Sequence, residues 1–327
     1  MTTTQVGEDF LRQASPFRRE LTAHCYRMLG SIHDAEDLVQ ETYLRAWRSY
    51  DAFEGRSSLR SWLYRIATNV CLTALEGRGR RPLPTGLGTA DADPEIPVVE
   101  QAEVPWLEPA PDAMVGASHA DPAAIVTSKE SVRLALIAAL QHLPPRQRAV
   151  LILRDVLKWR AAEVAELLDV STAAVNSMLQ RARAQLAEAA PAEDEVAEPT
   201  TQQQRDLLKR YVEAFESYDV NAIVALFTKD AVWEMPPFPT WYKGPESIGR
   251  LISAQCPAQR PGDLRLIPIE ANGQAAFAMY LRRDGRYHSF AINLVDLTPE
   301  GVKHGTMFFD TTLFPLFGMP ETLPADA

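Results

Sequence analysis

The feature that most constrains this chain is an acidic, proline-rich stretch in its first half. Residues 83–127 contain eight acidic residues and neither lysine nor arginine, and prolines recur throughout. Proline removes a backbone donor and breaks helices and central strands, so a regular packed core is not expected here. We interpret the stretch as a linker and treat it as a flexible coil, with residues 191–202 as a second, shorter acidic connector.

The two connectors divide the 327-residue chain into three candidate domains, which suits a length beyond that of a typical single core. These domains are residues 1–82, 128–190 and 203–327. The net charge of the chain is −10, yet residues 1–82 carry +2 and residues 129–190 carry +3. Two mildly basic blocks therefore remain, and they can contact DNA through local patches rather than through a global field.

Targeting and cysteine patterns narrow the class of protein. No apolar run approaches the roughly 18 residues of a membrane span, and the first ten residues carry acids rather than a basic signal, so we expect a cytoplasmic protein. Cys25, Cys71 and Cys256 are scattered without a CxxC pair, which favours neither a disulfide framework nor a zinc site. We expect three buried thiols, no metal and no other cofactor.

Residues 10–76 have the periodicity of successive amphipathic helices, and the clearest runs from Asp34 to Tyr50. Gly30 is expected to end the preceding helix and Asp34 to cap this one. Apolar positions at helical spacing form its expected buried stripe: Ala35, Leu38, Val39, Thr42, Tyr43, Ala46, Trp47 and Tyr50. The opposite face is acidic and polar, apart from one exposed leucine, Leu44.

Residues 128–190 contain the pattern of a helix-turn-helix. Helices are expected over 128–141 and 146–156, followed by Arg160–Leu168 and Thr172–Leu186. In the last helix, Val175, Leu179, Ala182 and Leu186 form a buried stripe that leaves polar residues outside. Asn, Gln and Arg on that outer face are the side chains that read base edges in a major groove. An ordinary helical hairpin with a solvated face is the alternative.

The pattern changes to strands in residues 203–327, after expected helices at 203–217 and 221–227. Five strands are expected: Ala231–Met235, Leu264–Glu270, Ala275–Arg282, Tyr287–Asp296 and Val302–Thr311. The tail is therefore expected to be a separate α+β domain.

Two segments carry a family resemblance. The segment from Asp34 to Arg81, which begins DAEDLVQETYLRAW, resembles region 2 of extracytoplasmic-function sigma factors of RNA polymerase. The segment from His142 to Leu186, HLPPRQRAVLILRDVLKWRAAEVAELLDVSTAAVNSMLQRARAQL, resembles their region 4. The family usually has glycine where Asp169 stands, although aspartate tolerates the left-handed conformation of such a turn. The resemblance implies two all-α domains, a region 2 helical bundle and a region 4 helix-turn-helix.

The resemblance also implies partners, namely core RNA polymerase and promoter DNA in duplex and melted form. The acidic face would dock on the polymerase, with a merely solvated face as the alternative; its residues are Asp34, Glu36, Asp37, Gln40, Glu41 and Leu44. The linker would thread the polymerase near the template path, or act as a plain spacer.

Residues implied to contact DNA fall into two groups. Those for the minus-ten element are Arg56, Ser57, Ser58, Arg60, Trp62, Arg65, Asn69, Arg78, Arg80 and Arg81. Trp62 has core packing as an equal alternative, and the last three arginines suit phosphate contacts. Those for the minus-thirty-five element are Arg160, Ser171, Thr172, Ala173, Asn176, Ser177, Gln180, Arg181 and Arg183.

The tail resembles the SnoaL-like branch of the nuclear-transport-factor-2 superfamily, on the segment RYVEAFESYDVNAIVALFTKDAVWEMPP followed by WYKGPESIGRLI. Relatives form a curved sheet around a conical pocket, and some are isomerases or cyclases. Candidate residues for a small-molecule pocket are Trp233, Met235, Trp241, Tyr280, His288 and His304. No spacing here fixes an acid–base pair, so we do not expect an enzyme.

The sequence therefore predicts a non-enzymatic sigma factor that directs promoter-specific initiation and is regulated in cis by its C-terminal domain. One alternative is a ligand-responsive regulator that uses only the helix-turn-helix. The other is a SnoaL-type isomerase or cyclase with a DNA-binding appendage.

Overall fold

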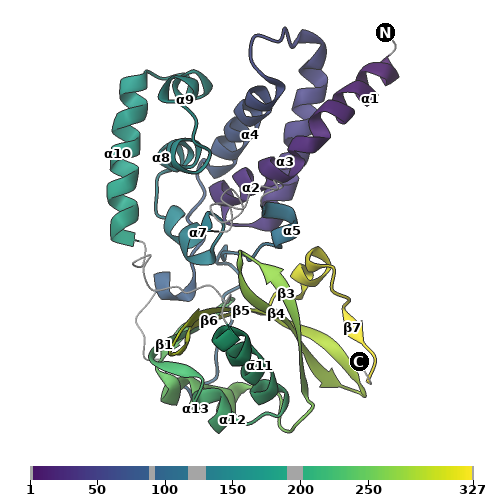
Figure 1. Cartoon of the computed structure of the whole chain (residues 1–327), viewed down its shortest axis with the longest axis vertical. Coiled ribbons are helices and arrows are strands. Elements are labelled where there is room, and N and C mark those ends of the chain that lie inside the picture. The colour runs from purple at the N-terminus through teal and green to yellow at the C-terminus, as the bar shows by residue number, and fades with distance from the viewer. Residues whose placement is uncertain (1–2, 88–92, 117–129, 190–201, 326–327) are drawn as a thin grey trace. The chain divides into compact units, whose positions relative to one another are not determined.

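The computed structural model describes residues 3–87, 93–116, 130–189 and 202–325. The chain forms two compact units (Figure 1). The first contains residues 1–81 and 112–191, and the second contains residues 82–111 and 192–327. Among the described residues, no helix is both long and apolar enough to cross a membrane.

The first part of the helical unit contains α1 (Thr3–Ala14), α2 (Arg18–Leu29), α3 (Ile32–Ser49) and α4 (Leu59–Leu75). Gly30 ends α2 in the left-handed conformation, as expected. The expected cap at Asp34 is wrong, because Ser31 caps α3 and its side chain accepts the backbone N–H of Asp34. The start of α3 is therefore two residues earlier than the periodicity indicated.

The buried stripe of α3 is narrower than expected. Ala35, Val39, Thr42 and Ala46 are buried at spacings of four, three and four residues. Trp47 is 44% exposed, because it lies one residue, or about 100° of helix rotation, beyond the stripe. Leu38 is only half-buried.

The second part of the helical unit contains α5 (Asp112–Val115), α7 (Leu134–Leu140), α8 (Pro145–Leu151), α9 (Ala161–Leu168) and α10 (Thr172–Ala189). A π-helical turn at Ile152–Val156 extends α8. Two arginines join the two parts of the unit. Arg148 donates to the carbonyl of Met28, and Arg27 donates to the carbonyl of Ser131 at 3.0 Å. The helix expected at 128–141 is interrupted, because a turn at residues 131–132 separates helical Glu130 from α7, which begins at Leu134.

Asp169 connects α9 to α10 with φ of 54°. This left-handed conformation is the one that the turn was expected to require, and it explains how aspartate replaces the usual glycine.

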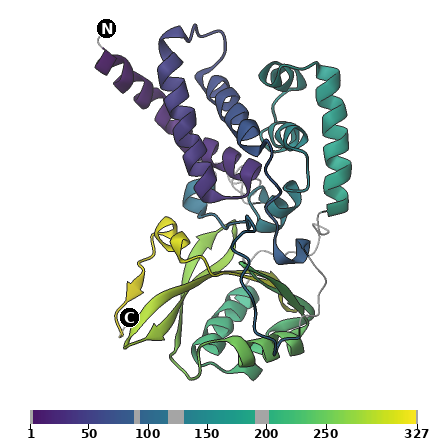
Figure 2. The same cartoon turned by 180° about the vertical axis from the view of Figure 1, so that it is seen from behind.

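The second unit is an α+β domain in which a mixed, curved sheet is not closed into a barrel (Figure 2). The strand order is β2-β1-β6-β5-β4-β3, with β7 paired to β5 and β1 parallel to β6. The strands are β1 (Phe227–Met235), β2 (Phe238–Lys243), β3 (Leu264–Ala271), β4 (Gln274–Arg283), β5 (Arg286–Thr298), β6 (Gly301–Phe308) and β7 (Thr322–Leu323). Helices α11 (Gln202–Glu216), α12 (Val220–Val224) and α13 (Pro245–Gln255) pack against one another and, through α11 and α13, against this sheet.

The expected fold class is therefore confirmed, with three local corrections. Neither β2 nor α13 was expected, although the sequence PESIGRLISAQ of α13 has helical spacing. The last long strand ends at Phe308, and Thr311–Phe317 is a 3₁₀ helix. Cys25 and Cys71 are buried as expected, but Cys256 is only half-buried.

Candidate polymerase, nucleic-acid and ligand interfaces

The outer face of α3 carries the residues expected to dock on the polymerase. Asp37 and Gln40 are exposed, and Leu44 is 48% exposed beside Trp47. Glu41 pairs with Arg45 one turn later, at 2.6 Å. The face thus combines acidic side chains with an exposed apolar pair, which suits a basic protein surface that has an apolar pocket.

Asp34 stands apart from this face. It accepts hydrogen bonds from Arg78 at 3.0 Å and from Arg81 at 2.7 Å. Two arginines expected to contact phosphate are therefore bound to a carboxylate expected to contact the polymerase. Arg80 instead lies 2.9 Å from the Nδ1 atom of His142, and burial followed by the charge of Arg80 lowers the pKa of that histidine.

One face of α4 gathers residues expected to contact melted DNA. Trp62, Arg65 and Asn69 follow one another at helical spacing, with the last two exposed. Trp62 is half-buried and stacks on Phe53, with ring centroids 4.7 Å apart. Ser58 caps α4 by accepting the N–H of Ser61, so its hydroxyl has a structural role.

The remaining residues of this group lie before α4 or behind its exposed face. Arg56 and Ser57 are exposed in the preceding loop, where Arg56 pairs with Glu54. Arg60 makes three hydrogen bonds to Glu20, at 2.7 to 2.9 Å. Its guanidinium also lies 5.0 Å from the ring centroid of Tyr64 and 6.0 Å from that of Trp159. Arg60 thus links α4 to α2 within the helical unit, through Glu20.

The outer face of α10 has the expected amide and hydroxyl groups. Seven residues of this face are exposed: Thr172, Ala173, Asn176, Ser177, Gln180, Arg181 and Arg183. Val175, Leu179 and Ala182 form the buried stripe, whereas Leu186 is only half-buried. Ser171 caps the helix by accepting the N–H of Ala174 at 3.1 Å.

Two of the arginines expected at the minus-thirty-five element have partners within the helical unit. Arg183 makes bidentate hydrogen bonds to Asp155, at 2.8 and 2.6 Å, and these bonds raise the pKa of the guanidinium. Arg160 caps α9 together with Glu163, whose carboxylate accepts the backbone N–H of Arg160 at 2.7 Å. That bond lowers the pKa of Glu163.

Part of the stretch interpreted as a flexible linker is bound to the second unit. We call residues 93–111 the linker strap; in Figure 2 it is the dark segment that runs along this unit. The backbone N–H of Ala110 donates to the side chain of Asn272 at 2.8 Å, and Pro111 forms an isolated β-bridge with Ala271. Leu107 is fully buried. These contacts contradict a free coil, because the sheet domain receives the apolar residues and satisfies the backbone.

A buried carboxylate holds the chain just before the strap. Glu234 on β1 is fully buried and accepts the backbone N–H of Thr85 at 2.8 Å. Its other oxygen lies 2.6 Å from the Nε2 atom of His304 on β6. Burial lowers the pKa of His304, but the hydrogen bond and charge of Glu234 outweigh it and raise the pKa overall.

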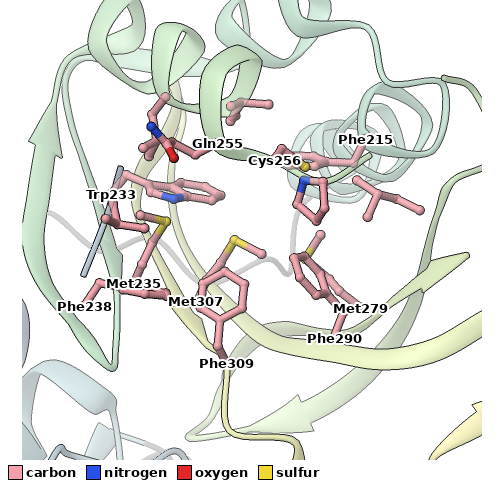
Figure 3. Close-up of a pocket in the computed structure, with 15 residues that line it drawn as sticks. Phe215, Trp233, Met235, Phe238, Gln255, Cys256, Met279, Phe290, Met307 and Phe309 are labelled. Carbon is pink, nitrogen blue, oxygen red and sulfur yellow. The ribbon is translucent and has the colours of Figure 1, made fainter. Parts of the chain in front are cut away.

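The sheet and α13 line an apolar cavity of about 230 Å³ (Figure 3). Its walls are Val98, Phe215, Trp233, Met235, Phe238, Leu251, Ile252, Gln255, Cys256, Pro257, Leu264, Met279, Phe290, Met307 and Phe309. None of these lining residues is a carboxylate, histidine, lysine or arginine, so they supply no acid–base pair. Burial raises the pKa of the Cys256 thiol.

Only Trp233 and Met235, among the six expected pocket residues, line this cavity. Tyr280 follows Met279 along β4, and its hydroxyl donates to the carbonyl of Pro320 at 2.9 Å, away from the cavity. His304 binds Glu234, His288 pairs with β7, and Trp241 is half-buried on β2. Alternation along β4 and β6 was the available signal for Met279 and Met307, which sequence reasoning missed.

Comparison with known proteins assigns a family to each part. The models for "Sigma-70 region 2", "Sigma-70, region 4" and "SnoaL-like domain" match residues 14–81, 133–186 and 208–308, respectively. The ECF RNA polymerase sigma factor SigG of Mycobacterium tuberculosis is 58% identical over 316 residues, which cover 96% of this chain and 85% of SigG.

A second relative agrees in sequence and in fold. The ECF RNA polymerase sigma factor SigJ of M. tuberculosis is 30% identical over 251 residues, covering 75% of this chain and 72% of SigJ. The crystal structure of that organism's extracytoplasmic function sigma factor SigJ superimposes with a TM-score of 0.60 at 23% identity. The match covers 95% of this chain and 99% of that one, so the two share a fold.

Proposed function

Because this chain belongs to the ECF RNA polymerase sigma factors, we propose which of its surfaces perform each step of that family's activity. The protein binds core RNA polymerase and promoter DNA and directs promoter-specific transcription initiation. It is a transcription factor and not an enzyme, so the isomerase or cyclase alternative is rejected. The alternative of a regulator that uses only the helix-turn-helix, without binding polymerase, is rejected as well. It acts in the cytoplasm, with residues 1–82 as region 2, 128–190 as region 4 and 203–327 as the regulatory domain.

The polymerase docks on the outer face of α3. The observation that supports this assignment is the joint exposure of Leu44 and Trp47, an apolar pair on an otherwise acidic and polar face. An apolar anchor surrounded by acids suits a basic protein partner, with the charges steering the encounter.

DNA is read by two other helices. Trp62, Arg65 and Asn69 on α4 offer an aromatic ring, a cation and an amide to an unstacked base and its phosphates. Asn176 and Gln180 on α10 can form paired hydrogen bonds to a base edge in the major groove, while Arg181 contacts phosphate. Arg60 is paired with Glu20, and Arg183 is paired with Asp155. Each arginine can contact DNA only after its ion pair has broken.

The C-terminal domain regulates the helical unit in cis. Its hold on the linker strap supports this role, because the strap joins region 2 to region 4 and cannot move freely while the domain holds it. A small molecule in the apolar cavity is the proposed effector, and a ligand acts only through different affinities for two states.

Transcription in vitro with purified core polymerase on a randomised promoter pool tests these assignments together. We expect the full chain to select promoters with defined minus-ten and minus-thirty-five elements. Truncation after Ala190 should change output or promoter choice. A truncated chain identical to the full chain in polymerase affinity, promoter choice and output would contradict cis regulation but leave the sigma activity intact.

A further inference from the structure

The cavity of the second unit has the size and lining of a binding site for an apolar small molecule. At about 230 Å³ it exceeds the volume of the apolar cavities, about 150 Å³, that stay dry and bind benzene. Aromatic rings and three methionine side chains dominate its wall. Methionine adapts its shape to irregular guests, so the lining can accommodate more than a single ring.

The lining also defines the charge of the guest. Burying an ionised group without a partner is costly, and no lining residue carries a charge to pair with it. Gln255 and the Cys256 thiol offer only a few hydrogen bonds to a polar group of the guest. The guest is therefore uncharged and mainly apolar.

One wall of this cavity is not part of the C-terminal domain's own sequence. Val98, which packs against the core of this unit, comes from the linker strap. On one side of Val98, Glu95 pairs with Arg250 of α13 at 2.9 Å. On the other side, the N–H of Gln101 donates to the carbonyl of Pro237 at 3.0 Å. The strap is thus pinned on both sides of the residue that faces the cavity.

The same elements line the cavity and anchor the strap. Gln255 lines the cavity and donates to the carbonyl of Pro94 in the strap at 3.3 Å. Phe238, which follows the strap's acceptor Pro237, also lines it. Filling the cavity therefore adds contacts to Val98 and supports both anchors.

We infer that an uncharged apolar small molecule binds in this cavity and holds the linker strap on the domain through Val98. The guest touches Val98 only while the strap is seated, so it binds the seated state more tightly and shifts the chain toward that state. The effect on transcription rests on the proposed cis regulation. If that regulation holds, the guest inhibits transcription by preventing the linker from binding the polymerase.

The first experiment locates a defined probe, N-phenyl-1-naphthylamine, in the full-length chain. Cys256 reports on the cavity, because Cys25 and Cys71 are fully buried elsewhere. A probe at ten times its Kd should slow alkylation of Cys256 by N-ethylmaleimide about tenfold, as followed by intact mass. Failure of the probe to bind, or binding that leaves Cys256 unprotected, overturns the site.

The second experiment tests the coupling with two neighbouring variants. Val98→Ala removes the contact, whereas Val99→Ala is the matched control, since Val99 is 73% exposed. We expect Val98→Ala to weaken probe binding about fivefold and Val99→Ala to leave it unchanged. By reciprocity, the probe should slow hydrogen exchange of the Gln101 amide by about the same factor, in the wild type and in Val99→Ala only.

The outcomes separate this inference from the proposed function. Equal probe affinity in the two variants would overturn the coupling. A hydrogen-exchange rate of the Gln101 amide that does not change when the probe is added would also overturn it. Transcription that the probe leaves unchanged, with binding and protection intact, overturns cis regulation and leaves the coupling standing.

Discussion

The helices α3 and α10 have the same length, 18 residues, and similar buried stripes, yet they present opposite surfaces. The outer face of α3 carries acids around Leu44, whereas that of α10 carries amides, hydroxyls and arginines. An acidic face with an apolar centre suits a protein partner and repels phosphate, and an amide face reads bases. We therefore propose that the outer faces, rather than the helical scaffolds, determine which partner each helix binds.

Reversing the charge of the α3 face should have the largest effect. The double variant Asp37→Arg, Glu41→Arg should abolish polymerase binding, a loss of at least about 2 kcal/mol, or roughly thirtyfold. Fluorescence anisotropy against core polymerase measures the affinity, and circular dichroism should show unchanged helix content. The control is the variant Asp51→Arg, in which an exposed acid just beyond α3 is replaced. This variant should bind core polymerase with unchanged affinity. Unchanged affinity in the double variant would refute the docking face.

The α10 face should respond to substitution in a different way. Asn176→Ala and Gln180→Ala should each cost roughly 1–3 kcal/mol on the preferred promoter and relax the preference at one base pair. Transcription from a set of minus-thirty-five variants measures both effects, with polymerase binding unaffected. Glu188→Ala, on the last turn of the same helix, serves as the control. If both variants retain the full preference at every position, α10 is not the reading helix.

The two arginines of the α10 face sharpen the comparison within one helix. Both arginines are exposed, but the side chain of Arg183 is paired with Asp155. Arg181→Ala should weaken binding to all sequences alike and reduce the salt slope by about one. Arg183→Ala should have a smaller effect, and Asp155→Asn should increase the contribution of Arg183 by releasing it. Equal salt slopes for the two alanine variants of the holoenzyme would contradict the difference.

The smallest expected effect concerns a half-buried charge, that of His304 beside the buried Glu234. The folded-state pKa of His304 is raised above 6.5, so protonated His304 stabilises the second unit fully below that pH. This contribution is lost as the pH rises through the folded-state value. We expect urea unfolding to show a loss of up to about 1 kcal/mol between pH 6 and pH 9 that is absent in His304→Gln. The same loss in the variant would assign the pH dependence to another group.

Much of the helical unit could be predicted from local spacing. The period of 3.6 residues placed Asn176 and Gln180 outside and Val175 and Leu179 inside, and the structure agrees. The same reasoning wrongly predicted that Trp47 is buried. Periodicity shows which side of a helix faces the core, but the neighbouring helices determine how many residues on that side they cover. Arg60 shows a second limit, since its partner Glu20 lies 40 residues away and no spacing rule connects them.

The cavity shows where prediction from spacing ends. Trp233 and Met235 were identified from their residue type. On β4, however, Tyr280 was expected to line the cavity and its neighbour Met279 lines it instead, while the Tyr280 hydroxyl binds the carbonyl of Pro320. Alternation along β4 places these two neighbours on opposite faces of the sheet, but the sequence does not say which face the cavity lies on. The wall contributed by Val98 depends on a segment whose composition predicted only a linker.

The helix faces, the two basic blocks and the family resemblance follow from the amino-acid sequence, because each depends on residues close together in the chain. Which charged side chains are paired, and where the linker strap lies, depend on the folded chain. Thr85 and Glu234 are 149 residues apart, and Ala110 and Asn272 are 162 apart. Such contacts form only when the whole domain folds and its buried polar groups need partners, so local pattern carries no trace of them.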